Sequence, residues 1–502
     1  MVTADRTFQA YYTKSDPITD YMVGMLNLQP SDTVFEPCGG DGVFVDKILA
    51  LNSSQKIVVY ELNPQATALL KDKYNHYGNV TVKETDTLLD PSIVTHRLKA
   101  SKIIGNPPYG AVFGEEAKAR IQRVYKGIYS KESYTLFLYA CILSLCNGGR
   151  LSFIVPDTFL SLHRHRSLRE LILTYTKIEE LLLFPSNFFP GVNFGYANLC
   201  IITLERSNDV AKNFSNTFRV YKDFVTVDDI GKPKRNGIKL VQGDVLRNVD
   251  SSFLITDNTG LSDLINGKSS VKVGDMASCV TGFYSGDDKS YLHPISKEIR
   301  NAKRYSVVAP EAVHNGTLTD EEKVKGIAGG NCMVPIVKGG NKRYSKPDEW
   351  FMDWSTKAVS EYRKSRKCRF QNSTFYFKQG IAVPMVRSGQ LTAALIDNRL
   401  FDQSIVGIFP HDSRWLFYLL GFLNSRVCSY AINLINPSTN NSANYIKQLP
   451  VIKPAEEDFD EVTSIVTQLA RGLDEESSMR AQDRLNVIFD RMYNFSCSTQ
   501  VK

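Results

Sequence analysis

The stretch Ile103-Ile104-Gly105-Asn106-Pro107-Pro108-Tyr109-Gly110 organises the first half of this chain. Its β-branched start predicts a buried strand, and the two prolines end that strand because a proline ring fixes φ and removes a backbone donor. The loop that follows offers the side-chain carbonyl of Asn106, backbone carbonyls beside the prolines and the ring of Tyr109. Carbonyl oxygens accept the hydrogens of an amino group, and an aromatic ring stacks on the plane that bears it. The stretch therefore predicts a site for an exocyclic amino group; the alternative is a proline-stiffened turn without chemistry.

The bulk composition is that of an ordinary globular protein. The chain has 502 residues, of which 43% are hydrophobic and 23% charged, and this predicts two or three domains. No apolar run reaches membrane-spanning length, and Met1 to Ala10 lacks the apolar core of a signal peptide. The nine cysteines show no CxxC pair and no metal-ligand spacing. We therefore expect free thiols, no metal site and a cytoplasmic location.

Positive charge is concentrated in one stretch of the second half. Residues 301–378 hold 15 Lys and Arg against 8 Asp and Glu, which accounts for the whole net charge of +7. Such a stretch is where a polyanion would be held, although a solvated basic helix is the alternative. Its densest part interleaves cations with aromatic residues, and the candidate DNA-binding residues are Arg363, Lys364, Arg366, Lys367 and Arg369.

A glycine-rich turn lies near the N-terminus. The strand-like run 33–35 leads into Glu36-Pro37-Cys38-Gly39-Gly40-Asp41-Gly42, and a helical pattern follows. This layout lets the backbone approach a nucleoside-bearing ligand closely. The third glycine of a dinucleotide fingerprint is replaced by Val45, and the turn has no Walker lysine. A small ligand without pyrophosphate is therefore favoured over NAD or ATP.

Acidic residues follow the next two predicted strands. Glu61 ends the strand 56–60, where an acid commonly takes both ribose hydroxyls; it could instead cap the helix that begins near Pro64. Asp86 follows the strand 80–83 and could accept from an adenine amino group, or be an ordinary turn aspartate.

Alternating strand and helix patterns continue to about residue 205 and end in an antiparallel hairpin, which predicts a parallel-rich α/β sheet. The basic run 163–166 with Arg169 predicts a solvated helix face with surface histidines, or a phosphate contact. Residues 206–260 are polar and irregular, as in a linker with some strands. The second half lacks β–α alternation, and apolar stripes at 462–469 and 485–492 have helical spacing.

Taken in order, these segments resemble the motif set of the gamma-class, TaqI-like adenine-N6 DNA methyltransferases of type II restriction-modification systems. The resemblance covers about residues 10–205. The matching segments are Thr13–Val23 for the methionine-binding motif, 36–44 for the glycine loop, Glu61 for the ribose acid, Asp86 for the adenine acid, Asn106–Tyr109 for the catalytic loop and Phe188–Val192 for the motif whose aromatic holds the flipped base.

Three positions depart from the family pattern. Lys14 stands where members usually have proline, and one residue is added in that motif. Thr87 occupies a place that is often aromatic in the family, and its side chain has no ring to stack on the cofactor. Cys38-Gly39 replaces the usual pair of small residues.

The resemblance implies a class I S-adenosylmethionine-dependent methyltransferase fold, with a mixed, mostly parallel seven-stranded sheet, over residues 1–250. An α+β DNA target-recognition domain would follow at 251–455 and a helical segment at 456–502. The implied reaction transfers a methyl group from S-adenosyl-L-methionine to N6 of a flipped adenine in duplex DNA. Implied catalytic residues are Asn106, Pro107, Pro108, Tyr109 and Phe189; implied cofactor-binding residues are Thr13, Glu36, Cys38, Gly40, Gly42, Glu61, Leu62, Asp86 and Thr87.

Implied partners are double-stranded DNA and a cognate restriction endonuclease of the same system, with no membrane and a monomeric chain. Competing interpretations are an RNA adenine or guanine methyltransferase, a protein methyltransferase of the release-factor type, a non-catalytic DNA-binding subunit, a nuclease fusion and cytosine-N4 methylation. The long second half disfavours the release-factor type, and the intact Asn106–Tyr109 loop with Glu61 disfavours a non-catalytic subunit. Asn106 itself disfavours cytosine-N4 methylation, which usually has serine at this place.

Overall fold

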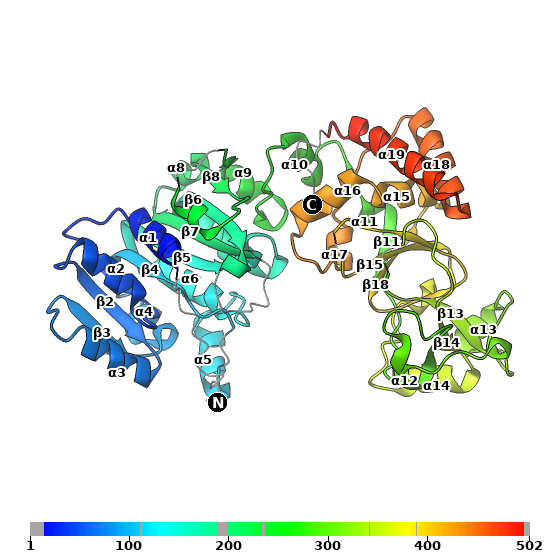
Figure 1. Ribbon diagram of the computed structural model, residues 1–502, viewed down its shortest axis with the longest axis horizontal. Coiled ribbons are helices and arrows are strands. Elements are labelled where there is room, and N and C mark those ends of the chain that lie inside the picture. Colours follow the sequence, from blue (N-terminus) through cyan, green and yellow to red (C-terminus); the bar gives the residue numbers. More distant parts are fainter. Residues whose placement is uncertain are drawn as a thin grey trace. The chain divides into compact units, whose positions relative to one another are not determined.

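The computed structural model describes residues 15–110, 113–188, 198–232, 236–340, 342–387 and 389–495 (Figure 1). The chain forms two compact units, Met1–Asp257 and Asn258–Lys502. The domain limits at residues 250 and 455 stay predictions. In the part of the chain described above, no helix is both long and apolar enough to cross a membrane.

The first unit is built on one nine-stranded sheet with the order β3-β2-β1-β4-β5-β7-β6-β8-β9 (Figure 1, blue to green). Strands β1 to β5 pair in parallel, whereas β7 runs antiparallel to both β5 and β6. This confirms the predicted parallel-rich sheet with a late antiparallel hairpin, and β8 and β9 extend its edge. The strands are β1 (Thr33–Glu36), β2 (Lys56–Glu61), β3 (Val80–Glu84), β4 (Ala100–Gly105), β5 (Leu145–Pro156), β6 (Thr176–Pro185), β7 (Asn198–Arg206), β8 (Thr217–Tyr221) and β9 (Ile238–Val241).

Central strands of this sheet are continuous apolar runs because both of their faces are covered. Ile103 and Ile104 of β4 are fully buried, as are Leu151 and Phe153 of β5. The helices of the unit are α1 (Asp16–Met25), α2 (Val43–Leu51), α3 (Pro64–Lys73), α4 (Pro91–Val94), α5 (Glu115–Val124), α6 (Ser133–Ser144), α7 (Arg166–Tyr175), α8 (Val210–Ser215) and α9 (Gln242–Arg247); the short 3₁₀ turns include η1 (Thr87–Leu89), η2 (Asp157–Leu160), η3 (His163–His165) and η4 (Ser186–Phe188).

The basic run before α7 is largely structural. His165 is 1% exposed, and its ring faces Glu132 at 3.0 Å, while Arg169 is fully buried. Arg169 donates to the carbonyls of Phe159 and Asp250 at 2.6 and 2.8 Å. Burial of a charged side chain is tolerated when such acceptors replace water. The expectation of a solvated face with surface histidines is therefore wrong for these two residues.

The second unit is an α+β unit with two four-stranded sheets, ordered β11-β18-β15-β16 and β12-β14-β13-β17, and a short pair β10-β19. Its strands are β10 (Val271–Lys272), β11 (Ala277–Thr281), β12 (Leu292–Pro294), β13 (Met333–Val337), β14 (Trp350–Asp353), β15 (Gly380–Pro384), β16 (Ala394–Ile396), β17 (Leu400–Phe401), β18 (Ile405–Pro410) and β19 (Pro450–Val451). Its helices are α10 (Thr259–Ile265), α11 (Val273–Met276), α12 (Asp288–Tyr291), α13 (Asp320–Lys325), α14 (Thr356–Lys364), α15 (Leu416–Leu423), α16 (Arg426–Ile435), α17 (Ala443–Ile446), α18 (Glu456–Arg471) and α19 (Glu475–Met492).

The C-terminal helices belong to this second unit. Helix α18 packs on α15, and α19 packs on α16 and α18. Val462 and Val466 of α18 and Leu485 and Ile488 of α19 are buried, so the apolar stripes read from the sequence are packing surfaces.

Candidate active site

The site lies at the edge of the large sheet where β1, β2, β4 and β5 end. Phe35 of β1 pairs with Ile103 of β4, and Glu36 pairs with Val59 of β2, all in parallel register. Loops that follow parallel strands leave the sheet at the same edge, which is where ligands bind in open α/β sheets. The glycine turn, Glu61 and the Asn106–Tyr109 loop are therefore brought to one edge.

The glycine turn has a backbone that other residues adopt only under strain. Gly40 and Gly42 have φ of +56° and +80°, in the left-handed region. A Cβ on Gly42 would lie 2.3 Å from the Tyr74 hydroxyl oxygen. That hydroxyl also lies 2.9 Å from the Gly42 carbonyl, so α3 and its C-terminal residue hold the turn in place.

Glu61 is joined to the glycine turn. Its Oε2 accepts from the Gly40 N–H and its Oε1 accepts from the Asn63 N–H, both at 2.8 Å. A carboxylate has about four acceptor positions, so each oxygen keeps room for a hydroxyl donor. The neighbouring Leu62 is 49% exposed, which places an uncovered apolar side chain beside the acid. Together, the Glu61 carboxylate and the Leu62 side chain can contact a ligand in which a hydroxyl-bearing ring adjoins an apolar ring.

Glu36 is an acceptor that the protein does not satisfy. Its side chain is 2% exposed, and its Oε2 has no hydrogen-bond partner within the described ranges. Burial, with the nearby carboxylates Asp41 and Glu61, raises the pKa of Glu36 well above its usual range. An unsatisfied buried carboxyl oxygen beside a glycine turn fits a ligand that brings a hydrogen-bond donor or a positive charge.

Asp86 and Thr87 lie at the start of η1. Asp86 Oδ1 accepts from the Leu88 N–H at 3.0 Å, and burial raises the pKa of the Asp86 carboxyl above its usual value. The Thr87 hydroxyl donates to the Pro37 carbonyl at 2.6 Å, and this side chain is 3% exposed. Thr87 therefore ties η1 to the glycine turn from inside the protein, which is a structural use of its side chain.

Cys38 brings the glycine turn against the Asn-Pro-Pro-Tyr loop. A Cβ on Gly105 would lie 3.4 Å from the Cys38 sulfur, so the thiol lies against the end of β4. The Asn106 backbone N–H is a hydrogen-bond partner of that thiol, while burial raises the pKa of Cys38 well above its usual range. Contact between these residues makes the two loops immediate neighbours.

The Asn-Pro-Pro-Tyr loop is fixed from α6. The Ser133 hydroxyl donates to the Pro108 carbonyl at 2.5 Å. Asn106 is half-buried at the strand end, whereas Tyr109 is 1% exposed and packs edge-on against Tyr134 with ring centroids 6.4 Å apart. The Tyr109 hydroxyl lies 3.4 Å from the Ile154 carbonyl. In this state the Tyr109 ring is a core side chain and its faces are covered.

Asp157 is a buried acid at this edge of the sheet that the sequence interpretation did not single out. It follows β5, the parallel neighbour of β4, and it opens η2. Burial raises the pKa of Asp157 to about 6, while the Asn198 side-chain amide donates to it at 3.2 Å. The signal available in the sequence was an acid directly after the buried strand that follows the Asn-Pro-Pro-Tyr loop.

The sequence interpretation also did not single out Ser133, which holds the Asn-Pro-Pro-Tyr loop, or its neighbour Glu132. Glu132 lies directly before Ser133, and the Arg164 guanidinium donates to its carboxylate at 2.6 Å. No sequence pattern marks a serine at a helix start as a partner of a loop 25 residues earlier.

Two predicted residues lie outside the described ranges, namely Thr13 and Phe189. Phe188, just before Phe189, stacks on Phe184 with ring centroids 5.9 Å apart.

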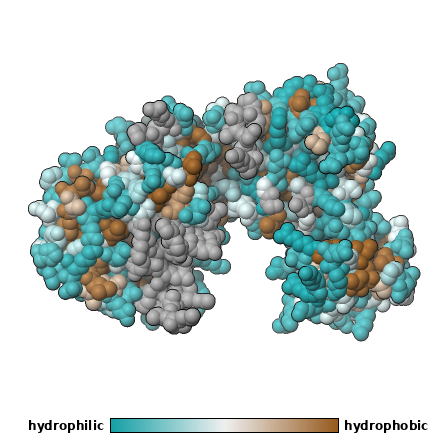
Figure 2. Space-filling model, viewed as in Figure 1, coloured by the Kyte–Doolittle hydropathy of each residue, from teal (hydrophilic) through white to brown (hydrophobic). Residues whose placement is uncertain are grey.

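The five predicted DNA-binding cations do not share one environment. The Arg363 guanidinium donates to the Val324 carbonyl at 2.7 Å and lies over the Phe370 ring at 4.5 Å. Lys364, Arg366 and Lys367 are exposed and have no ion pair within the ranges that the structure covers. Figure 2 shows a mostly hydrophilic visible face on each unit, interrupted by groups of hydrophobic side chains. Unpaired surface cations are available to an external anion, and Arg363 is not one of them.

Residues 57–189 match the model of the Eco57I restriction-modification methylase family, and residues 1–112 match that of the ribosomal RNA adenine dimethylases. A type II methyltransferase of Haemophilus influenzae, M.HincII, is 28% identical over 186 residues, which are 35% of this chain and 34% of that protein. M.AccI of Acinetobacter calcoaceticus is 22% identical over 282 residues, which are 55% of this chain and 50% of that one. The chain thus spans between a third and a half of the length of these curated relatives.

Two solved structures share the fold over most of the chain. The DrdV–DNA complex has a TM-score of 0.54 at 11% identity and covers 93% of this chain and 57% of that one. The LlaGI nuclease-deletion mutant, in complex with a DNA substrate mimic, has a TM-score of 0.53 at 14% identity and covers 92% and 47%. Both matching family models describe methylases, which confirms S-adenosyl-L-methionine as the cofactor.

Proposed function

Since residues 57–189 match the model of the Eco57I restriction-modification methylases, we propose that this chain methylates N6 of an adenine in duplex DNA. The observation that supports the proposal is the contact of Cys38 with Gly105 and Asn106, because a cofactor held at the glycine turn would then lie beside an amino group held at the Asn-Pro-Pro-Tyr loop. A methyl transfer needs its two reactants within about 3–3.5 Å of each other and in line.

The residues of the glycine turn fit the cofactor. S-adenosyl-L-methionine supplies a methyl group on a sulfonium, which is the electrophile of the reaction. Glu61 would take the ribose hydroxyls with the acceptor positions that Gly40 and Asn63 leave open. Glu36, with its unsatisfied buried oxygen, would accept from the ammonium of the methionine end. Leu62 would cover the adenine ring, and Asp86 would accept from the adenine amino group.

The Asn-Pro-Pro-Tyr loop would orient the target amino group. Adenine N6 is a poor nucleophile because its lone pair is delocalised into the ring. Asn106 Oδ1 and the Pro107 carbonyl would accept its two hydrogens and draw the nitrogen toward a tetrahedral shape, which frees the lone pair for in-line attack. The Pro108 carbonyl is already used by Ser133, so Pro107 is the backbone acceptor of choice. The proton leaves after transfer, so no carboxylate base at the amine is required.

The adenine must leave the duplex to reach this loop, because N6 cannot be approached in line inside the base stack. Extrusion costs a few kcal/mol, and each base–aromatic stack returns about 1–3 kcal/mol. Tyr109 and Phe189 would be the two stacking residues. Since Tyr109 is 1% exposed, its ring must turn out of the core when the base arrives. Target binding is therefore coupled to a rearrangement of this side chain.

DNA would also contact the basic stretch of the second unit, where Lys364, Arg366 and Lys367 are exposed. Contacts from such cations to phosphates position a duplex without reading its sequence. We further propose a monomer that works in a restriction-modification system, where methylation protects host DNA from a cognate endonuclease.

RNA adenine methylation is the second candidate, because residues 1–112 also match the ribosomal RNA adenine dimethylases. That match stops near the Asn106–Tyr109 loop and leaves the whole second unit without a role. The match of residues 57–189 to a restriction-modification methylase model, and the similarity to type II methyltransferases, favour DNA as the substrate.

The test supplies the full chain with tritiated S-adenosyl-L-methionine and, in parallel, unmethylated duplex DNA or bulk RNA, and separates the products as nucleosides. The expected label is N6-methyldeoxyadenosine, absent with Asn106→Ala although that variant still binds the cofactor. Label confined to RNA would move the function to RNA methylation. Label on cytosine N4 would overturn the assignment of the target base, and no transfer with cofactor bound would favour a binding role.

A further inference from the structure

Three segments of the second unit meet beside the basic stretch. Tyr284 and Arg369 exchange both backbone hydrogen bonds, at 2.9 and 3.4 Å, and the Gln403 N–H donates to the Phe283 carbonyl at 2.8 Å. The Arg369 guanidinium donates to the side-chain carbonyl of Gln403 at 3.3 Å. Arg369 is exposed and Gln403 is half-buried. An outward-facing arginine is therefore oriented by a glutamine from another segment.

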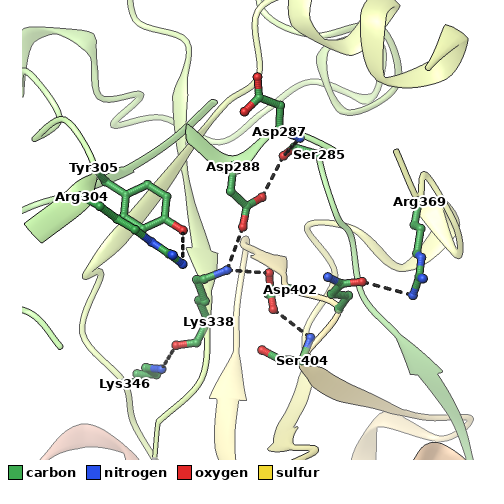
Figure 3. A network of polar contacts seen from close by, with 11 residues as sticks. Ser285, Asp287, Asp288, Arg304, Tyr305, Lys338, Lys346, Arg369, Asp402 and Ser404 are labelled. Carbon is green, nitrogen blue, oxygen red and sulfur yellow. Dashed lines mark hydrogen bonds and ion pairs between the residues drawn. The ribbon is translucent and has the colours of Figure 1, made fainter. Parts of the chain in front are cut away.

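A network of partly buried charge holds the same segments together (Figure 3). Lys338, which follows β13, forms ion pairs of 3.1 Å with both Asp288 and Asp402. The Ser285 hydroxyl donates to Asp288, and the Ser404 N–H donates to Asp402, each at 2.8 Å. Asp402 is the residue before Gln403, and Asp288 belongs to the segment that carries Tyr284. The ion pairs thus fix the backbone on both sides of the Arg369–Gln403 pair.

A second lysine stiffens this support. Lys346 is 7% exposed and donates to the carbonyl of Lys338 at 2.6 Å (Figure 3). It also donates to the carbonyl of Gly339. A cation buried without a carboxylate is rare, and here its donors are used to pin the chain that follows β13. Side chains locked by such a supporting layer are what precise recognition needs.

The neighbouring cations lack this support. Lys364, Arg366 and Lys367 are exposed and have no ion pair in the described ranges, so they are free to follow an anion wherever it lies. Arg369 is exposed and held by the side chain of Gln403, whereas the Arg363 guanidinium is turned to the Val324 carbonyl and the Phe370 ring. A loose cation suits a phosphate, whereas an oriented guanidinium suits a base edge.

We propose that Arg369 reads a guanine of the recognition sequence in the major groove and that Gln403 is the positioning residue that aims its guanidinium; this inference rests on the proposed function. The guanidinium fork matches the O6 and N7 acceptors of guanine, which is the commonest specific contact between protein and DNA. Lys364, Arg366 and Lys367 contact phosphates on either side.

The test maps methylated adenines by sequencing plasmid DNA that has been treated with the full chain, first to obtain the wild-type recognition sequence. Arg369→Ala is expected to lower discrimination about 10-fold or more at one guanine position and to leave the other positions unchanged. Lys367→Ala is the matched control: it should lower methylation evenly across sequences and reduce the salt dependence of binding by about one unit of slope.

Conservative variants distinguish a loss of guanidinium orientation from a general loss of folded structure. Arg369→Lys keeps the charge but not the fork, so it should lose discrimination at the same position as Arg369→Ala. Gln403→Glu keeps an acceptor and should retain discrimination that Gln403→Ala loses. An even loss at all sequences with Arg369→Lys, or an unchanged recognition sequence, would overturn the inference. A wild-type chain that methylates no adenine in DNA would instead overturn the proposed function.

Discussion

Replacing Ser133 with alanine should slow methyl transfer far more than it weakens the fold. The Ser133 hydroxyl donates to the Pro108 carbonyl at 2.5 Å, and that carbonyl lies two residues beyond Asn106. The substitution removes this hydrogen bond, so the loop is then positioned by the contacts of its end residues Asn106 and Tyr109. Loss of one such bond lowers the free energy of unfolding by about 0.5–1.5 kcal/mol.

The expected effect on the rate is larger, because the two Asn106 and Pro107 oxygens must meet both hydrogens of one amino group. A displacement of about 1 Å in a reacting geometry costs about 10²-fold in rate, which corresponds to about 2.7 kcal/mol of activation free energy. Cofactor affinity should stay unchanged, since the hydrogen bond that joins Gly40 to Glu61 lies in other loops than the one that Ser133 holds.

The assay compares Ser133→Ala with Ser144→Ala at the other end of α6. The Ser144 hydroxyl donates to the Ala140 carbonyl at 2.9 Å and is fully buried, so the control removes a similar bond from the same helix. Single-turnover methylation measures the chemical step, calorimetric titration measures cofactor affinity, and denaturant unfolding measures stability. Equal rate losses in the two variants would refute the assignment of Ser133 as a positioning residue of the catalytic loop.

Two further predictions concern the sheet edge. Gly42→Ala should weaken cofactor binding and lower stability by more than about 1 kcal/mol, because its left-handed φ is unfavourable for alanine and its Cβ would lie 2.3 Å from the Tyr74 hydroxyl; calorimetric titration and denaturant unfolding measure both. Asp157→Asn should be more stabilising at pH 8 than at pH 5, as measured by unfolding at each pH. The Asp157 pKa rises from 3.8 unfolded to about 6 folded, so its stabilising contribution is complete below pH 3.8 and is lost as the pH rises through 6. A pKa difference of roughly two corresponds to at most about 3 kcal/mol.

Each of these predictions has a matched control or a contradicting result. Gly24→Ala, in α1, meets no atom within 4 Å and has an ordinary helical backbone, so it should stabilise the chain by about 0.5–1 kcal/mol. A Gly42→Ala variant that behaves like Gly24→Ala would show that the turn is not strained. A stability difference between Asp157→Asn and wild type that is the same at both pH values would show that Asp157 titrates normally.

Much of the first unit could be predicted from the sequence because its signals are local. The β-branched run before Asn106, the glycines with positive φ and the acid that ends β2 each follow from constraints within a few residues. The parallel register then brings the loops together without further information. The position of each motif was therefore predictable, as was their common edge.

The contacts that support those motifs were not predictable in the same way. Ser133 reaches the Pro108 carbonyl across 25 residues, and His165 is buried against Glu132 in a run that looked like a solvated basic face. Tyr109 was predicted as a stacking residue, yet it packs in the core in this state. Such features depend on which side chains the folded chain brings together, and no local pattern encodes them.

The contact at the end of β4 makes two distant positions interdependent. A Cβ on Gly105 would lie 3.4 Å from the Cys38 sulfur, 3.4 Å from the Pro37 ring and 3.3 Å from the Phe153 ring. The Cβ of an alanine at residue 105 would therefore touch all three side chains, whereas a longer side chain there would require one of them to move. Positions 38 and 105 should covary in relatives, and a graft of either loop alone into another scaffold would lose this contact between the two loops.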